Sequence, residues 1–160
     1  MQAATSLTIR FAGAKDAPAV ARVLYESFAE FKALYTDGAF AATALSAEQI
    51  LNRMQEGPVW VALRDEAVVG SVAAVAKGAS VYIRGMAVLP AARGSGAGAT
   101  LLRTVENWAV REGYGRLYLS STPFLTSAIR LYEGFGFRRM EEGPQDLFGT
   151  ALFTMEKVTG

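Results

Sequence analysis

Three consecutive runs of apolar and β-branched residues constrain the fold of this chain more than any other feature. Each run has the length of a strand, and the short polar pairs between them, Asp65-Glu66 and Lys77-Gly78, are typical of tight turns. Strands joined by such short turns pair antiparallel with their neighbours. We therefore predict an antiparallel meander of three strands, over residues 59–63, 68–76 and 80–88.

Apolar periodicity predicts the elements around this meander. Alternation predicts a strand over residues 7–11, and helical spacing predicts a helix that is capped by Asp16 and ends near residues 35–38. Ser46 and Gln49 have capping-box spacing, which predicts a second helix. Two more helices follow residues 98 and 127, and strands are expected at 116–120, 137–141 and 151–157. The order β-α-α-β-β-β-α-β-α-β-β indicates an α/β fold of the mixed, α+β kind, in which helices cover a sheet.

Composition restricts the class of protein. A chain of 160 residues that is 51% hydrophobic and 19% charged can bury one core unaided, so we expect a single domain over residues 1–160. The 16 basic and 15 acidic residues form no run of one sign, which argues against nucleic acid and membranes as partners. The first ten residues, MQAATSLTIR, lack a secretion signal, and no apolar tract is long enough to span a bilayer. We therefore expect a cytoplasmic protein.

The sequence contains neither cysteine nor histidine. Without them the chain cannot perform Ser-His-Asp or Cys-His hydrolysis, and it cannot form the usual cysteine- and histidine-ligated zinc sites. We expect no metal, and chemistry that uses tyrosine, serine, lysine, arginine, carboxylates or backbone groups.

A glycine-rich turn connects the meander to the third predicted helix. Gly94, Gly96 and Gly98 allow positive φ angles and keep Cβ atoms away from a ligand. The amides that open a helix point outward unpaired, and the helix dipole favours an anion there, so the turn suits a phosphate or pyrophosphate, with Arg93 at its rim. A plain strand-to-helix connection explains the same glycines equally well.

Two commoner phosphate motifs compete for this turn. A Walker A loop ends in Gly-Lys-Ser/Thr, but Gly98-Ala99-Thr100 has no lysine. The spacing of Gly94, Gly96 and Ala99 fits the dinucleotide pattern G-x-G-x-x-A, which would indicate a nicotinamide-dependent oxidoreductase. That pattern requires an acidic residue about 20 positions later at a strand end. The nearest acid, Glu112, precedes Gly113 at a helix end, which counts against a dinucleotide.

The chain resembles the GNAT superfamily of acyl-CoA-dependent N-acetyltransferases in two motifs. Residues 88–90, Arg93-x-x-Gly96-x-Gly98 and the leucines at 101 and 102 are similar to the family's acyl-CoA motif. Residues 128–137 are similar to its A-x-x-x-Y-E-x-x-G-F motif. The resemblance implies a GNAT-like domain with a mostly antiparallel sheet of six to seven strands, splayed between the fourth and fifth strands and flanked by four helices.

The resemblance also implies a binding site for acetyl-CoA. Gly85 supports it physically, because a glycine inside a β-branched strand marks a bulge or a close ligand approach, although it can also merely relieve crowding. An asparagine that contacts CoA in the family is replaced here by Leu125. The implied acetyl-CoA-binding residues are Met86, Ala87, Val88, Arg93, Gly94, Ser95, Gly96, Ala97, Gly98, Ala99 and Leu125.

For the chemistry, the resemblance makes Tyr132 the proton donor to the CoA thiolate, although its spacing alone also fits a core aromatic. We expect its buried site to narrow the gap between the phenol and thiol pKa values. Ser120 stands where the family often has a glutamate base; it can order a water or bind substrate but cannot hold a proton near pH 7. Water or a carboxylate must then serve as base, with candidates at Glu26, Glu30 and Asp37.

Phe31, Tyr35 and Phe148 are candidate residues for an apolar amine pocket, or they seal a helix against the sheet. The sequence thus predicts an enzyme that moves the acetyl group of acetyl-CoA to a primary amine of a small molecule or peptide by direct attack. A non-catalytic acyl-CoA-binding or sensing module is the alternative, because Ser120 and Leu125 replace functional residues. A homodimer is compatible with the sequence, which does not fix the oligomeric state.

Overall fold

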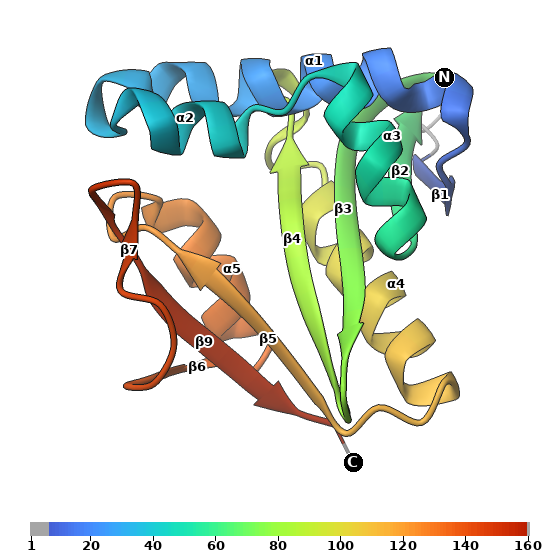
Figure 1. Ribbon diagram of the computed structural model, residues 1–160. Coiled ribbons are helices and arrows are strands. Elements are labelled where there is room, and N and C mark those ends of the chain that lie inside the picture. The colour runs from blue at the N-terminus through green and yellow to red at the C-terminus, as the bar shows by residue number, and fades with distance from the viewer. Residues whose placement is uncertain (1–6, 160) are drawn as a thin grey trace.

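The computed structural model describes residues 7–159, and its centre is a seven-stranded sheet (Figure 1). The strands of this sheet are β1 Leu7–Phe11, β2 Val59–Arg64, β3 Ala67–Lys77, β4 Ser80–Val88, β5 Arg116–Ser121, β6 Arg138–Met140 and β9 Phe153–Val158. They lie in the order β1-β2-β3-β4-β5-β9-β6. Every neighbouring pair is antiparallel except β4 and β5, which run parallel. The predicted mixed, mostly antiparallel sheet is confirmed.

The predicted meander is present as β2, β3 and β4. The first turn consists of Asp65 and Glu66, which have φ angles of 52° and 68°, and the second contains Gly78 at 61°. Positive φ at both central residues of the first turn matches the right-handed twist of the flanking strands, so the pair Asp65-Glu66 closes this hairpin as predicted. The second turn lies one residue later than predicted, because Lys77 still pairs with Ser80 and the turn consists of Gly78 and Ala79.

Five α-helices lie in residues 7–159, where the sequence predicted four. The additional helix, α2, is capped by Thr36, whose hydroxyl accepts a hydrogen bond of 3.1 Å from the amide of Ala39. The polar stretch at 35–38, interpreted as a helix end, therefore also starts a helix, because threonine is a good N-cap. The helices are α1 Ala17–Phe28, α2 Asp37–Thr43, α3 Ala47–Glu56, α4 Ala97–Arg111 and α5 Thr126–Gly134.

Two predicted caps have different outcomes. Ser46 and Gln49 form the expected capping box at the start of α3, with hydrogen bonds of 3.2 and 2.9 Å. Asp16 precedes α1 but does not cap it with its side chain. Its carboxylate instead accepts hydrogen bonds from the guanidinium of Arg10 and from the amide of Gly13. The predicted side-chain cap is therefore wrong, because Arg10 on β1 offers the carboxylate a charged donor that the local sequence does not reveal.

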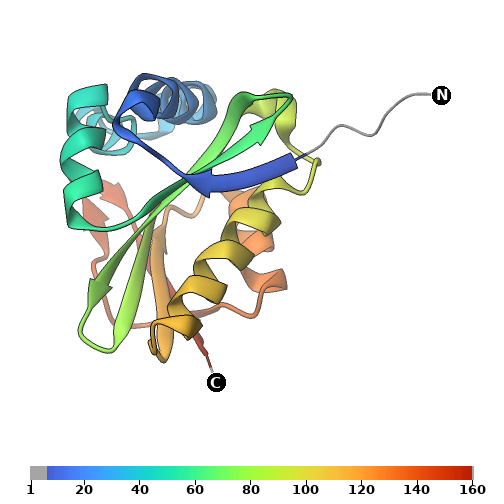
Figure 2. The same cartoon turned by 90° about the vertical axis from the view of Figure 1, so that its right-hand side faces the viewer.

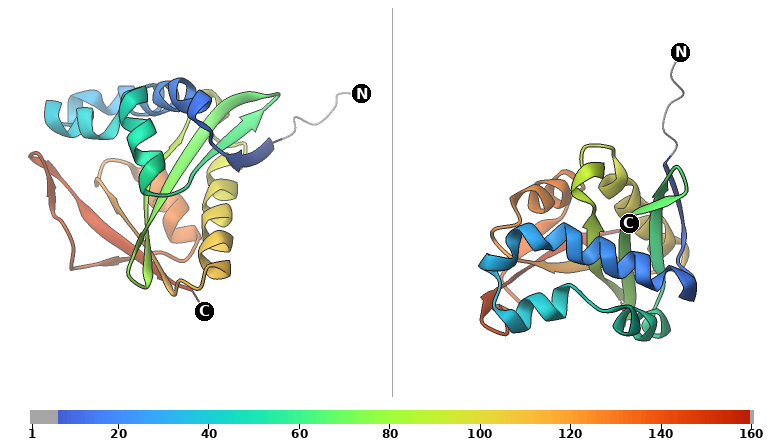
Figure 3. Two further views of the ribbon diagram at one scale, coloured as in Figure 1. Left: turned by 45° about the vertical axis from the view of Figure 1, so that its right-hand side comes forward. Right: turned by 90° about the horizontal axis from the view of Figure 1, so that it is seen from above.

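The helices cover both faces of the sheet, as Figures 2 and 3 show. On one face α1 and α3 pack around Val23, Leu24 and Ile50. On the other face α4 and α5 pack on a second core, which includes Leu101, Val105 and strand residues. Alternate residues of β2 enter opposite cores, Trp60 with α4 and the next residue with α1, as the two-residue period of a strand requires.

The C-terminal part contains an unpredicted hairpin, β7 Asp146–Leu147 and β8 Thr150–Ala151, before β9. β9 then lies between β5 and β6, so residues near the end of the described chain form the strand next to one edge of the sheet. This placement depends on pairing between distant segments, which residue periodicity does not report.

The expected splay between β4 and β5 is also confirmed. The two strands pair only over residues 80–82 of β4 and 116–118 of β5, and Figure 1 shows them diverging beyond this point. No helix within residues 7–159 is long and apolar enough to cross a membrane. Residues 1–6 and 160 lie outside the described residues. They include both ends of the predicted domain and part of the N-terminal stretch in which the sequence showed no secretion signal.

Candidate active site

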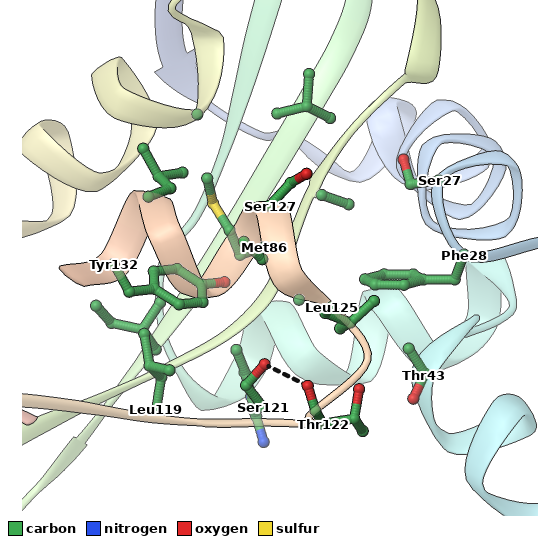
Figure 4. Close-up of a pocket in the computed structure, with 18 of the residues that line it drawn as sticks. Ser27, Phe28, Thr43, Met86, Leu119, Ser121, Thr122, Leu125, Ser127 and Tyr132 are labelled. Atoms are coloured by element: carbon green, nitrogen blue, oxygen red, sulfur yellow. Dashed lines mark hydrogen bonds between the residues drawn. The ribbon is translucent and has the colours of Figure 1, made fainter. Parts of the chain in front are cut away.

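A cavity of about 750 Å³ opens where β4 and β5 part. Its walls come from α1, α3, α4 and α5 as well as from both strands, so it joins the two faces of the sheet through the split. Figure 4 shows Ser27 and Phe28 of α1, Met86 of β4, and Tyr132 of α5 around this space. The cavity therefore brings together segments that are more than 100 residues apart in the sequence.

Strand β4 contributes an unpaired edge to the cavity. Between Ser71 and Ala73 of β3 the register with β4 shifts, and Gly85 on β4 has a φ of 63°. The predicted bulge is thus present, and beyond it Met86, Ala87 and Val88 line the cavity. Because β5 has already diverged, the edge of β4 that faces it keeps free backbone donors and acceptors.

The glycine turn forms the second wall and opens α4. Gly94 and Gly96 have φ angles of 82° and 87°, and a Cβ on either would meet nothing within 4 Å. Both line the cavity, so side chains are absent where a ligand approaches the first amides of a 15-residue helix. The turn has the form and the dipole of an anion site.

Gly98 has a different role in the same turn. A Cβ there would lie 2.9 Å from Cδ2 of Leu131, so this glycine allows α4 to lie close to α5. Ala97 and Ala99 also line the cavity, whereas Ser95 does not. The hydroxyl of Ser95 donates to the carbonyl of Ala92 and so stabilises the turn instead.

Arg93 lines the cavity, but its guanidinium is already occupied. It forms an ion pair with Glu30 and donates a hydrogen bond of 3.0 Å to the carbonyl of Ser27. The sequence had suggested separate roles for the two charged residues, Arg93 at the phosphate and Glu30 as a candidate base. The structure brings them together, which fastens the glycine turn to the end of α1.

Tyr132 projects from α5 into the cavity, with its hydroxyl toward the open space in Figure 4. Its side chain is buried, and none of the hydrogen bonds described within residues 7–159 involves its hydroxyl. Burial, with a smaller effect from Tyr35, raises its pKa above the ordinary value of a phenol. We expected burial to bring the pKa of Tyr132 closer to that of the CoA thiol. This expectation is wrong, because desolvation disfavours the phenolate and raises the pKa of the phenol.

The cavity contains no carboxylate among the described residues that line it. Glu26 and Asp37 are exposed and do not line it. Ser120 does line it, and Leu125 lies at the start of α5 on the same space. Glu30 does not line it either, so none of the three candidate carboxylates reaches the cavity, whereas Ser120, which can order a water but cannot hold the proton itself, does.

The predicted apolar pocket is partly assembled. Phe31 and Tyr35 line the cavity, and both pack on Phe124, with ring centroids 6.1 and 4.9 Å away. Phe148 does not line it: this side chain is 69% exposed at the tip of the β7–β8 hairpin and contacts Gly38 of α2. The hairpin, which the sequence did not predict, holds Phe148 outside.

Two arginines that the sequence did not single out lie in the same cavity. Arg53 comes from α3 and Arg84 from β4. Nη1 of Arg53 lies 2.7 Å from the position that a Cβ on Gly85 would take, so it covers the bulge. The sequence signal for Arg53 was weak, because an arginine on the polar side of a short helix usually faces solvent.

The split sheet and the cavity at the split define an acyltransferase fold. The model of the acetyltransferase (GNAT) family matches residues 21–137, and the chain belongs to this family. The resemblance seen in the two motifs is thereby confirmed. The nicotinamide alternative is not supported, because the glycine turn follows an antiparallel meander rather than the first strand of a parallel sheet.

Relatives and solved structures agree with this assignment. The chain is 33% identical over 132 residues to an uncharacterized N-acetyltransferase, YjgM, of Escherichia coli, covering 79% of each. It is 40% identical over 83 residues to human N-acetylaspartate synthetase, a match that covers 51% of this chain and 28% of that enzyme. The PaiA N-acetyltransferase of Thermoplasma acidophilum, solved with coenzyme A, superposes with a TM-score of 0.83 at 19% identity, covering 96% of this chain and 99% of that one. YncA of Salmonella typhimurium, a putative acetyltransferase solved with acetyl-CoA, gives a TM-score of 0.72 at 23% identity over 95% and 93%.

Proposed function

We propose that the protein is an acetyl-CoA-dependent N-acetyltransferase that acetylates a primary amine of a small molecule or peptide. The observation that carries this proposal is a single cavity that joins the glycine turn, the free edge of β4 and the hydroxyl of Tyr132. Family membership and the neighbours solved with coenzyme A or acetyl-CoA support the choice of co-substrate.

Each wall of the cavity has a feature that suits one part of acetyl-CoA. The amides at Gly94, Gly96 and Gly98 suit the pyrophosphate, because the turn opens a helix and a Cβ at Gly94 or Gly96 would meet only open space. The free edge of β4 at residues 86–88 suits the amides of the pantetheine arm, which can pair with it as another strand would. The gap between the strands then receives the thioester.

The reaction would proceed by direct attack. The nitrogen of a neutral amine forms a bond to the thioester carbonyl carbon, the carbon–sulfur bond breaks, and the thiolate takes a proton. Tyr132 is the residue placed to supply that proton, because its hydroxyl reaches the cavity and has no hydrogen-bond partner among the described residues. Its raised pKa keeps the hydroxyl protonated but makes it a weaker acid than a free phenol, so the transfer is uphill and is completed when the phenolate regains a proton from water. The amine proton leaves through water, since no carboxylate lines the cavity among the described residues; Ser120 is placed to order such a water.

Thiol release from acetyl-CoA in the presence of primary amines tests the proposal, with mass spectrometry of the product. Calorimetry with acetyl-CoA provides the binding measurement. Binding together with amine-dependent thiol release supports the enzyme. Binding without release for any amine would favour a non-catalytic acyl-CoA-binding module. This alternative is supported by the cavity lining, which contains no carboxylate among the described residues.

We also propose that residues 1–160 form one domain, that the protein acts in the cytoplasm, and that it can form a homodimer. Limited proteolysis tests the domain, fractionation of cells tests the location, and light scattering in solution tests the oligomeric state. A stable fragment cut between the two motifs would contradict the single domain.

A further inference from the structure

The cavity contains a cation with no counter-ion. Arg53 lines the cavity from α3, and within residues 7–159 no carboxylate lies within ion-pair distance of it. Its neighbour Glu56 pairs with Arg84 instead. Burial, and then repulsion by Arg84, lowers the pKa of Arg53 to about 10, so the group is still charged at neutral pH. Arg53 is half-buried, and a partly desolvated charge without a partner is costly, so an anionic ligand at this position would reduce that cost.

Arg53 also lies beside the part of β4 that we propose for the pantetheine arm. Its Nη1 covers the bulge at Gly85, directly before the β4 edge at residues 86–88. Gly85 is the residue that makes room for it, because any Cβ there would lie 2.7 Å from Nη1. An anion bound to this guanidinium would therefore sit beside the β4 edge that we propose for the pantetheine arm.

The charges around Arg53 restrict the ligand further. Arg84 and Arg53 together carry two positive charges, and Glu56 provides one negative charge. Because no carboxylate lines the cavity among the described residues, its acceptor side has a net positive charge. A diamine would be repelled, whereas a ligand with one carboxylate would be neutralised.

On this basis we infer that the acyl acceptor is a free α-amino acid with an uncharged side chain, whose carboxylate binds the guanidinium of Arg53. This inference rests on the proposed acetyltransferase function. In an α-amino acid the amine is attached to the carbon next to the carboxylate, so anchoring the carboxylate at Gly85 keeps the amine near the thioester. The side chain then lies toward the apolar wall formed by Phe28, Phe31 and Tyr35.

The reaction balances with acetyl-CoA as the only co-reactant. The α-amine nitrogen bonds to the acetyl carbonyl carbon, the carbon–sulfur bond breaks, and the products are an N-acetyl amino acid and coenzyme A. One proton leaves the amine to water, the thiolate takes one from Tyr132, and water returns a proton to the Tyr132 phenolate. Arg53 takes no part in proton transfer; it binds and orients the acceptor.

Matched acceptors test the inference directly. Thiol release is measured with leucine and phenylalanine, with their amides, with the corresponding amines 3-methylbutylamine and phenethylamine, and with 1,4-diaminobutane. Because a hydrogen-bonded charge pair contributes more than a neutral contact, we expect kcat/KM for the amino acids to exceed that for their matched amides and amines by roughly 10- to 100-fold. The diamine should be the poorest acceptor.

Variants then assign the effect to Arg53. Arg53→Gln should lower kcat/KM for amino acids by about the same factor, mainly through KM. The kcat/KM values for the matched amines and the calorimetric affinity for acetyl-CoA should not change. Arg53→Lys should restore part of the loss, since lysine keeps the positive charge but cannot form the two parallel hydrogen bonds by which a guanidinium binds a carboxylate. Arg22→Gln is the matched control, because Arg22 is an exposed residue of α1 that does not line the cavity.

Three results would overturn the inference. Amides or amines that react as well as the amino acids would show that the carboxylate is not recognised, while the acetyltransferase function would stand. Equal losses for every acceptor in Arg53→Gln would show that Arg53 only supports the fold. Binding of acetyl-CoA without thiol release for any acceptor would overturn both the inference and the proposed function.

Discussion

Arg93 and Glu30 form an ion pair that fastens the glycine turn to the end of α1. Both side chains are partly exposed, at 41% and 46%, so the pair adds little to stability, about 1 kcal/mol or less. The pair matters more for ligand binding, because Glu30 neutralises the positive charge of Arg93, which lies beside the proposed phosphate site.

We therefore predict that Glu30→Gln strengthens acetyl-CoA binding by about two- to fivefold at low salt, since the freed charge of Arg93 can act on phosphate. The gain should shrink at higher ionic strength. Calorimetry at two salt concentrations measures it, with Glu26→Gln as the exposed control on α1. A large loss of turnover in Glu30→Gln, with binding unchanged, would instead indicate that Glu30 is the base.

The hydroxyl of Tyr132 can be tested by Tyr132→Phe. We expect kcat to fall by about 100-fold or more, because the thiolate loses its proton donor. Stability should change by no more than about 0.5 kcal/mol, since the hydroxyl has no hydrogen bond within the described chain. Tyr114→Phe is the control, because Tyr114 stacks on Trp108 and does not line the cavity. Full activity in Tyr132→Phe would exclude the proton-donor role.

The pKa of Tyr132 also predicts the pH profile. Burial raises this pKa above the usual phenol value of 10, so the donor form persists as the pH rises. We expect kcat/KM to fall at low pH, where the acceptor amine is protonated, and to show no falling limb below pH 10. A falling limb between about pH 8 and 9 that Tyr132→Phe abolishes would contradict the assignment.

Gly96 and Gly113 provide a matched pair for the glycine turn. They have φ angles of 87° and 88°, and a Cβ on either meets nothing within 4 Å. Alanine at either position should therefore cost a similar strain, about 1–2 kcal/mol in thermal or chemical unfolding. Only Gly96 lines the cavity, so we expect Gly96→Ala alone to weaken acetyl-CoA binding, by about tenfold. Equal affinities in the two variants would show that the turn is only a connection.

Asp16 predicts an acid-sensitive contribution to stability. Arg10, followed by the amide of Gly13, lowers its pKa from 3.8 to about 2, so the folded state prefers the ionised form. The stabilisation is fully present above pH 4 and is lost as the pH falls toward 2. Because Arg10 is 44% exposed and screened, we expect about 1–2 kcal/mol.

The measurement for Asp16 is the free energy of unfolding of the protein and of Asp16→Asn from pH 7 to pH 2. The difference between them should be largest near neutral pH and should nearly vanish at pH 2. Glu112→Gln, which removes an exposed carboxylate at the end of α4, should give no such difference. A difference for Asp16→Asn that stays constant over the whole range would show that the ion pair is not its source.

Much of the fold could be predicted from local pattern. The meander, the bulge at Gly85 and the capping box at Ser46 follow from residue types that act over a few positions. Helix α2 was missed because Thr36 caps it just where the preceding helix was expected to end. The β7–β8 hairpin was missed because its strands have two residues each, too few for a period to appear.

The candidate site divides in the same way. The cavity position of the residues in the glycine turn, except Ser95, could be predicted, because a strand, a glycine turn and a helix are consecutive in the chain. The exclusion of Phe148 could not, since its position depends on a hairpin that contacts α2. The raised pKa of Tyr132 depends on how deeply α5 buries it, which spacing along one helix cannot give.

By itself, therefore, the sequence determined which segments form strands and helices and where an anion could meet a helix start. Only the tertiary structure decided which charges meet: Arg93 with Glu30, Arg84 with Glu56, and Arg53 with no carboxylate over Gly85. The physical reason is the distance along the chain over which each interaction acts. Backbone preference and apolar periodicity act between near neighbours, whereas an ion pair or an unpaired cation depends on how separate helices pack on the sheet.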